Sequence, residues 1–282
     1  MRFSLYTLPM QSEFQPKKVD ERLAGPLWRS VSRVFRTLVK AFAFILLGVL
    51  SLLLGLVLIP ISRFIWGTGT KQEVRIQGWI QRMAQGYLFL IQAAGTCVIR
   101  FEGEEKLKEP GILVVANHPT LLDAVVLMSQ MPQVDCVVKE RYFHDRFLGL
   151  AAQGAGYIPS GDGPRMVDIC VEKLNRGRSI MIFPEGTRSP SQGLGTFNRG
   201  AAHIAIRANR SLVPVTIRCN PPTLNREEKW WDVPRKRFEL TLCVGDSLPV
   251  CRMAQSDESQ ARVAREVTES MRHYFERQVS IV

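Results

Sequence analysis

A histidine and an aspartate stand five residues apart at the end of an apolar segment in the middle of the chain. Residues 111–123 read GILVVANHPTLLD, so His118 and Asp123 follow five apolar residues. Such a run predicts a strand that is covered on both faces, and α/β sheets place their chemistry at the carboxyl ends of their strands. Pro119 suits the first turn of a helix, which would bring Asp123 within reach of the imidazole. The pair then supplies a general base and the carboxylate that orients it.

This pair lacks the nucleophile of a hydrolase triad, so the substrate would have to supply a hydroxyl or an amine. An isolated H-x4-D pattern also has a simpler explanation. His118 and Asp123 would then only cap a helix.

A second polar stretch follows another predicted strand, 179–182. Residues 183–189 read FPEGTRS. Arg188 suits a phosphate or a carboxylate, because a guanidinium binds these groups in a bidentate manner. Glu185 can orient Arg188 or bind an acceptor hydroxyl, and Gly186 allows the backbone to pass close to a ligand. The alternative is a local salt bridge that shapes the turn.

The two stretches, in this order and at this spacing, resemble the glycerolipid acyltransferase family, which includes the lysophosphatidic acid acyltransferases. The resemblance covers roughly residues 111–217. It implies an α/β fold with a mixed, largely parallel sheet flanked by helices. It also implies catalysis by His118 and Asp123, with acyl-CoA or acyl-carrier protein as the acyl donor and no other cofactor. The acceptor would be bound by Glu185, Gly186, Thr187 and Arg188.

Three further residues are candidates for substrate binding: Asn117, Arg165 and Arg199. Arg199 precedes a glycine, where the family often has a basic residue. Where family members often carry an arginine that helps to hold the acceptor, this chain has Ser160. Arg165 either substitutes for that arginine or is a surface residue at a helix start.

The acceptor is therefore left open. Lysophosphatidic acid is the default for the family, and a lyso-ornithine lipid, a polyene or a glycolipid are alternatives. A non-catalytic lipid-binding protein that retains the fold is a further alternative, and so is a hydrolase that uses water in place of the acceptor.

The composition indicates an anionic partner. The 282 residues carry a formal net charge of +11, and 46 % of them are apolar, which is enough for a substantial core. This charge favours membrane lipid, an acidic carrier protein or nucleic acid, and the sequence contains no nucleic-acid-binding module. The six cysteines form no C-x-x-C pair and the four histidines are scattered. We therefore expect core thiols in a reducing compartment and no metal site.

The N-terminal third predicts attachment to a membrane. Residues 1–21 read as a flexible tail without a secretory signal, and residues 22–95 as membrane-associated helices. A basic helix over 23–40 would attract anionic headgroups, and the uncharged run 41–62 is long enough to cross a bilayer. An amphipathic helix over 74–94 would lie at the membrane interface, with Trp79 and Tyr87 as anchors.

The orientation of the apolar run is open, because basic residues flank it on both sides. It either crosses the membrane or dips into one leaflet and returns, with a bend at Gly48, Gly55 or Pro60. We expect the remainder, residues 96–282, to form the acyltransferase domain on the cytoplasmic face of the inner membrane.

Local patterns predict most elements of this domain. Strands are expected over 97–102, 111–116, 134–138, 179–183, 212–217 and 238–244, and helices from Pro119 and over 164–176, 201–208 and 256–278. The stretch 221–237, with Trp230 and Trp231, is either a flap that touches the membrane or a packed connection.

Overall fold

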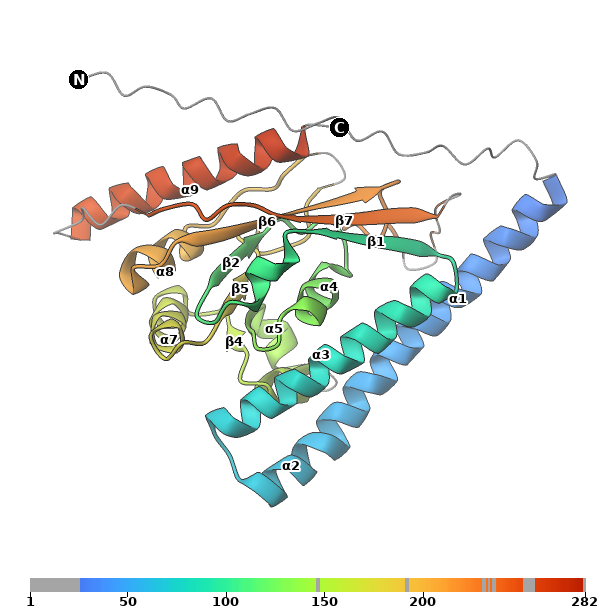
Figure 1. Ribbon diagram of the computed structural model, residues 1–282, viewed down its shortest axis with the longest axis horizontal. Helices are drawn as coiled ribbons and strands as arrows, with labels where there is room; N and C mark the ends of the chain where they lie inside the picture. Colours follow the sequence, from blue (N-terminus) through green and yellow to red (C-terminus); the bar gives the residue numbers. More distant parts are fainter. Residues whose placement is uncertain are drawn as a thin grey trace.

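The central element of the computed structural model is a mixed, mostly parallel sheet (Figure 1). The structure describes residues 26–145, 148–190, 193–229, 232, 234, 237–250 and 257–280. Within these residues, seven strands form one sheet in the order β1-β7-β6-β2-β5-β3-β4. The five strands from β6 to β4 are parallel, β7 is antiparallel to β6, and β1 is parallel to β7. The predicted fold class is thus confirmed.

The strands follow the predicted ranges closely. Their bounds are β1 (Cys97–Glu102), β2 (Leu113–Ala116), β3 (Asp135–Val138), β4 (Ile158–Pro159), β5 (Ile180–Ile182), β6 (Leu212–Asn220) and β7 (Phe238–Val244). The sequence does not predict β4, because two residues are too short for a periodic pattern. Its place at the edge of the sheet suits Pro159, which has no N–H to donate.

Both faces of the sheet are covered by helices, as the alternation within β2 illustrates. Val114 and Ala116 belong to an apolar cluster with α3 (Thr70–Ala93) and α4 (Asp123–Gln130). Leu113 and Val115 point to the opposite face and pack with the other three helices. These are α7 (Gly163–Asn175), α8 (Gly200–Ala208) and α9 (Asp257–Val279), all within two residues of the predicted ranges.

Helix α4 begins at Asp123, and the prediction of a start at Pro119 is wrong. A capping turn over residues 120–122 delays the helix. The Thr120 N–H donates to Asp123 Oδ2 at 2.7 Å, and Thr120 Oγ1 accepts from the Leu122 N–H at 3.1 Å. The Thr120 hydroxyl also donates to Asp123 Oδ1, so the two side chains hold this turn together before the helix starts. Three short helices, η3 (Glu104–Lys108), α5 (Glu140–Phe143) and α6 (Leu148–Gly154), were not predicted either.

The predicted basic and apolar segments form one helical run rather than two elements. It consists of α1 (Pro26–Leu53), the π-helical turn η2 (Leu54–Leu58) and α2 (Ile59–Trp66). The π turn lies just before Pro60, whose ring cannot fit behind a regular α-helical turn. Gly55 allows α6 to pack closely here, since a Cβ at this position would lie 2.9 Å from Leu150 Cβ.

Helix α3 returns beside α1 (Figure 1). Most of its predicted apolar stripe is covered by protein, whereas Leu90 is 49 % exposed. Ile76, Tyr87 and Ile91 are 0 %, 4 % and 6 % exposed. The prediction of Tyr87 as an interfacial anchor is therefore wrong. Trp79 is half-buried and lies edge-on to Trp66, with ring centroids 6.4 Å apart.

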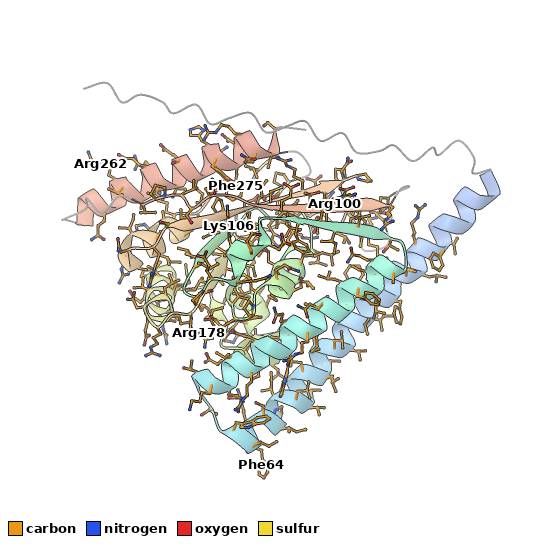
Figure 2. All side chains as sticks on the ribbon, in the orientation of Figure 1. Phe64, Arg100, Lys106, Arg178, Arg262 and Phe275 are labelled. Atoms are coloured by element: carbon orange, nitrogen blue, oxygen red, sulfur yellow. The ribbon has the colours of Figure 1, made fainter. Side chains whose placement is uncertain are left out.

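The outer face of α1 and α2 has the opposite character, because it is apolar and exposed. Residues Val34–Trp66 are long and apolar enough to cross a membrane by length and composition, and only 22 % of that window is buried within the protein. Figure 2 shows Phe64 at the tip of this helical pair, where it is 93 % exposed. The structure thus offers the predicted candidate for membrane insertion.

Several predictions fall outside the described residues. They concern the N-terminal tail 1–21, the first residues of the basic helix, the pair Trp230 and Trp231, and Cys251. The other five cysteines are free thiols.

Candidate active site

His118 and Asp123 lie in contact at the carboxyl end of β2. The imidazole Nδ1 is 2.8 Å from Asp123 Oδ2. The His118 side chain is 19 % exposed, whereas the Asp123 side chain is fully buried. The two groups therefore meet inside the protein, and the imidazole has a solvent-facing part that a substrate can reach.

The environment of Asp123 acts on its pKa in two directions. Burial raises the pKa of this carboxyl above its usual range, because water no longer solvates the charge. Hydrogen bonds from His118 and from the Thr120 hydroxyl and N–H oppose that shift. These donors fix both carboxylate oxygens and aim one of them at Nδ1.

The second motif holds the backbone of His118. The His118 N–H lies 3.1 Å from Glu185 Oε1 and 3.3 Å from Ser189 Oγ, and the Ser189 N–H donates to the His118 carbonyl at 2.7 Å. These contacts form because β2 and β5 are adjacent parallel strands, so the segments that follow them meet at one edge of the sheet.

Glu185 is buried and has no contact with Arg188. Its Oε1 also accepts from the Ser189 hydroxyl at 2.6 Å, and its Oε2 accepts from the Gly195 N–H at 2.7 Å. The alternative explanation, a Glu185–Arg188 salt bridge that shapes the turn, is therefore not found among the described contacts. The carboxylate faces inward, toward the frame that supports His118.

Arg188 holds a different segment. Its Nη1 donates to the carbonyls of Leu224 and Asn225 at 2.9 and 2.6 Å. The Leu224 carbonyl also accepts from the Leu121 N–H at 3.1 Å, so this segment reaches the catalytic turn. Gly186 has φ of +62°, which favours glycine, and its N–H closes the turn to the Phe183 carbonyl at 2.9 Å.

The remaining candidates lie at the same edge of the sheet without joining this cluster. Asn117 is buried, and its amide exchanges two hydrogen bonds with Ile217, of 2.8 and 2.7 Å. It thus extends the pairing of β2 with β6. Arg165 and Arg199 are exposed at the starts of α7 and α8, and Ser160 is exposed at the end of β4.

Three residues of this site received no role from the sequence. Phe183 stacks on the His118 ring, with centroids 4.2 Å apart and planes at 22°. Ser189 and Thr120 anchor His118 and Asp123, as described above. The T-x-x-D spacing carries a signal for Thr120, whereas the roles of Phe183 and Ser189 appear only once the strands pair. Within the described residues, no group of three His, Cys, Asp or Glu side chains is arranged to hold a metal ion.

Comparison with known proteins identifies the same region. A family model described as Acyltransferase matches residues 98–218. Over 126 residues the chain is 33 % identical to the chloroplastic 1-acyl-sn-glycerol-3-phosphate acyltransferase LPAT1 of Arabidopsis thaliana, covering 42 % of this chain and 35 % of that protein. These findings support the family that the motifs predicted, for residues 98–218.

Another relative of the chain has a different acceptor in its name. The lyso-ornithine lipid O-acyltransferase of Pseudomonas aeruginosa is 30 % identical over 141 residues, covering 49 % of this chain and 54 % of that protein. The chain therefore spans about a third to about a half of the length of these two relatives.

The fold extends beyond that region. The crystal structure of the 1-acyl-sn-glycerophosphate acyltransferase PlsC from Thermotoga maritima matches with a TM-score of 0.63, covering 87 % of this chain and 97 % of that one. At 18 % sequence identity, this likeness shows the shared fold alone.

Proposed function

We propose that the chain transfers a fatty acyl group from an acyl thioester to the hydroxyl of a lysophospholipid-type acceptor. The observation that carries this proposal is the 2.8 Å contact between His118 Nδ1 and the buried Asp123 carboxylate. With Nδ1–H donating to Asp123, Nε2 keeps a lone pair that can accept a proton.

The reaction then needs no nucleophile from the protein. His118 Nε2 takes the proton of the acceptor hydroxyl while the oxygen attacks the thioester carbonyl carbon. The tetrahedral intermediate collapses, the carbon–sulfur bond breaks, and the imidazolium returns the proton to the leaving thiolate. Asp123 orients the ring and stabilises its positive charge while it holds the proton.

Glu185 and Ser189 support this chemistry through the backbone of His118. They act as positioning residues, because they contact the His118 peptide and not the imidazole. Backbone donors for the oxyanion were expected at the start of the Pro119 helix or in the Gly186 loop. The N–H groups of residues 120–122 and of Gly186 already have acceptors. The oxyanion therefore needs other donors.

We propose lysophosphatidic acid as the default acceptor and acyl-CoA or acyl-carrier protein as the donor. The name of the Arabidopsis relative supports a glycerol phosphate acceptor. The net charge of +11 suits anionic donors and acceptors of this kind.

A lyso-ornithine lipid is the second candidate acceptor. Two observations favour it, namely the name of the Pseudomonas relative and Ser160 in place of the expected arginine. Without that arginine, one positive charge fewer is available for a phosphate headgroup.

We further propose that the protein lies on one side of the membrane, at the cytoplasmic face. Helix α3 carries Lys71, Glu73, Arg75 and Arg82, and its Gln77 donates to Asp135 at the sheet at 3.0 Å. Such a helix cannot return through hydrocarbon. Both ends of the α1–α2 run would then stay on the side of the sheet, with the exposed apolar face buried in one leaflet.

The test is acyl transfer by the purified full-length protein in detergent. Labelled acyl-CoA and acyl-carrier protein are offered with lysophosphatidic acid and lyso-ornithine lipid, and free fatty acid is measured in parallel. We expect transfer by the wild type, its abolition in His118→Ala, and a fall of about 10²–10⁴-fold in Asp123→Asn. Full activity of His118→Ala would contradict the mechanism, and release of fatty acid without an acceptor would indicate a hydrolase.

A further inference from the structure

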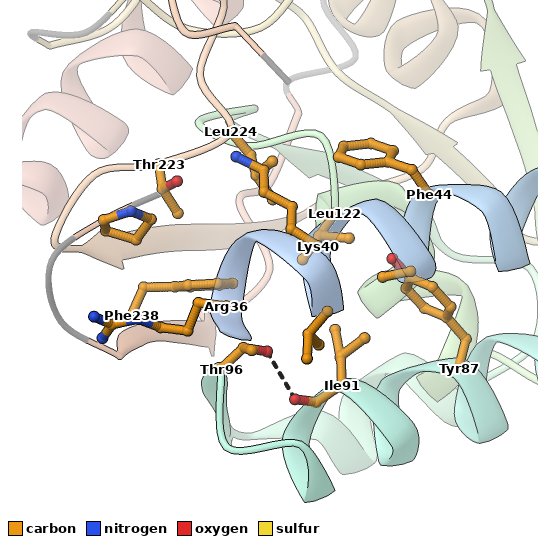
Figure 3. Close-up of a pocket in the computed structure, with 13 residues that line it drawn as sticks. Arg36, Lys40, Phe44, Tyr87, Ile91, Thr96, Leu122, Thr223, Leu224 and Phe238 are labelled. Atoms are coloured by element: carbon orange, nitrogen blue, oxygen red, sulfur yellow. Dashed lines mark hydrogen bonds between the residues drawn. The ribbon is translucent and has the colours of Figure 1, made fainter. Parts of the chain in front are cut away.

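A pocket separate from His118 lies between α1, the end of α3 and the start of β7 (Figure 3). Its cavity volume is about 50 Å3. The apolar part of its lining includes Ala43, Tyr87 and Leu122. Leu224, from the segment 221–229, also lines it. Two cations of α1, Arg36 and Lys40, also line it.

Arg36 has an unusual environment for an arginine. Its Nε is buried without a hydrogen-bond partner, and its guanidinium has no ion pair among the described residues. An anion in the pocket would supply the missing acceptor.

Lys40 is in a different state. Burial lowers the pKa of its ammonium, while Glu228 and Asp232 oppose that shift. The ammonium donates to the Asp232 carbonyl. Lys40 thus has nearby acceptors within the protein, and Arg36 is the cation that lacks one.

The neighbours of Arg36 on the same helix indicate where a ligand would come from. Phe35, Leu38 and Phe42 are 54 %, 63 % and 61 % exposed, on the apolar face that we assign to the leaflet. Cationic and apolar residues side by side on one helix suit a molecule with an anionic head and an alkyl chain.

We propose that this pocket binds a lipid phosphate, with the anion paired to Arg36 and the adjoining methylene groups against Ala43, Tyr87 and Leu122. The ligand is either a phospholipid of the leaflet or the phosphate-bearing acceptor itself. Binding of a phospholipid does not depend on the proposed function, whereas binding of the acceptor rests on it.

The pocket is connected to the catalytic turn by Leu224. Leu224 lines the pocket. Its carbonyl accepts from the Leu121 N–H at 3.1 Å and from Arg188 Nη1 at 2.9 Å. An occupied pocket therefore stabilises the segment that holds Arg188 and the turn before Asp123.

Binding is measured with dodecyl phosphate added to the full-length protein in dodecyl maltoside, with dodecanol as the uncharged probe. We expect the phosphate to raise the Tm in a saturable manner and dodecanol to have little effect. Arg36→Gln should weaken the binding about tenfold, the loss of one charged contact. Arg63→Gln is the matched control, because Arg63 is exposed on α2 outside the pocket, and it should bind like the wild type.

Two further variants keep the test decisive. Ala43→Leu fills the pocket without a change in charge and should also lose binding, even if Arg36→Gln proves unstable. His118→Ala should retain binding, so that failure of this site and failure of the proposed catalysis are distinguished. Equal binding by Arg36→Gln, Ala43→Leu and Arg63→Gln, or no saturable binding by the wild type, would overturn the proposal.

Acyl transfer in neutral micelles, with and without phosphatidylglycerol, identifies the source of the phosphate. If the ligand is a phospholipid of the leaflet, we expect phosphatidylglycerol to activate the wild type but not Arg36→Gln, with the KM for the acceptor unchanged in the variant. If the ligand is the acceptor, we expect the KM of Arg36→Gln for the acceptor to rise about tenfold without phosphatidylglycerol. If neither parameter changes, the link from the pocket to catalysis is wrong.

Discussion

Ser189 contacts both polar backbone groups of His118, the carbonyl and the N–H. The Ser189 N–H donates to the His118 carbonyl at 2.7 Å, and its hydroxyl oxygen lies 3.3 Å from the His118 N–H. The same hydroxyl donates to Glu185 at 2.6 Å. The position of the imidazole therefore depends on a loop that follows a different strand of the sheet.

Ser189→Ala removes the hydroxyl from this arrangement and leaves the backbone bond in place. We expect the free energy of unfolding to fall by about 1–2 kcal/mol, because Ser189 is buried and its partners lose a hydrogen bond. We expect kcat to fall about tenfold through displacement of His118, with little change in KM. Denaturant unfolding and steady-state transfer assays measure the two effects. Ser211→Ala, at an exposed position away from this site, is the control. An unchanged kcat in Ser189→Ala would contradict the positioning role.

Glu185→Gln tests the other support of His118. The carboxylate accepts three hydrogen bonds, from the His118 and Gly195 N–H groups and from the Ser189 hydroxyl. A glutamine has one acceptor oxygen, so its amide nitrogen would face a donor inside the protein. We expect a loss of about 2 kcal/mol in the free energy of unfolding, together with a lower kcat.

Unfolding and transfer measurements on purified Glu185→Gln check this, with the exposed Glu227→Gln as its control. If Glu185 instead binds the acceptor, the variant would keep its stability and show mainly a higher KM. That outcome would favour the role suggested by the family resemblance.

The two possible roles of Glu185, support of His118 or binding of the acceptor, show how far the sequence alone can predict the site. The elements with a clear local period, β1, β7 and α7 to α9, match their predicted ranges closely. The proximity of His118 and Asp123 is local too, since five residues separate them. Glu185 and His118 are 67 residues apart, and their contact exists because β2 and β5 pair.

Other differences between prediction and structure arise because a sequence pattern does not show which part of the protein a side chain will contact. The stripe of α3 satisfies the criterion for a membrane-interface helix, and α4 and the sheet bury most of it, while Leu90 stays exposed. Arg188 was expected to bind substrate, and its Nη1 donates to two backbone carbonyls. Every residue offers such a carbonyl, so side-chain types gave no signal for this contact.

His203 on α8 makes the stability of the protein pH-dependent. Burial and the positive charges of Arg199 and Arg207 lower the pKa of its imidazole below the usual 6.5. The unfolded chain therefore binds a proton there at a pH at which the folded protein does not. We expect this contribution to stability to be complete above pH 6.5 and to be lost as the pH falls through the lowered pKa.

Thermal unfolding of the wild type and of His203→Gln over pH 5 to 8 measures the effect. The variant cannot take up this proton, so its Tm should fall less steeply below about pH 6.5. His273→Gln is the control, since His273 is exposed on α9. Parallel Tm profiles for the wild type and His203→Gln would rule out this contribution.

A buried charge cluster on the opposite side from His118 joins α3 to the sheet. Asp135, fully buried at the start of β3, accepts two hydrogen bonds of 2.6 Å from Arg178, one of 3.0 Å from Lys173 and one of 3.0 Å from Gln77. Asp135→Ala would leave two cations without their central partner. We expect a loss of about 3–5 kcal/mol in the free energy of unfolding, the usual result of breaking a buried ion pair on one side.

Because this cluster lies at the amino ends of the strands, transfer activity per folded molecule should remain near that of the wild type. Denaturant unfolding in detergent measures the stability, and activity is normalised to the folded fraction at the same temperature. Asp246→Ala, which breaks the exposed pair with Lys106, should have a much smaller effect. Equal stability losses in the two variants would mean that the buried cluster does not hold α3 to the sheet, whereas lost activity in folded Asp135→Ala would link the position of α3 to the catalytic edge.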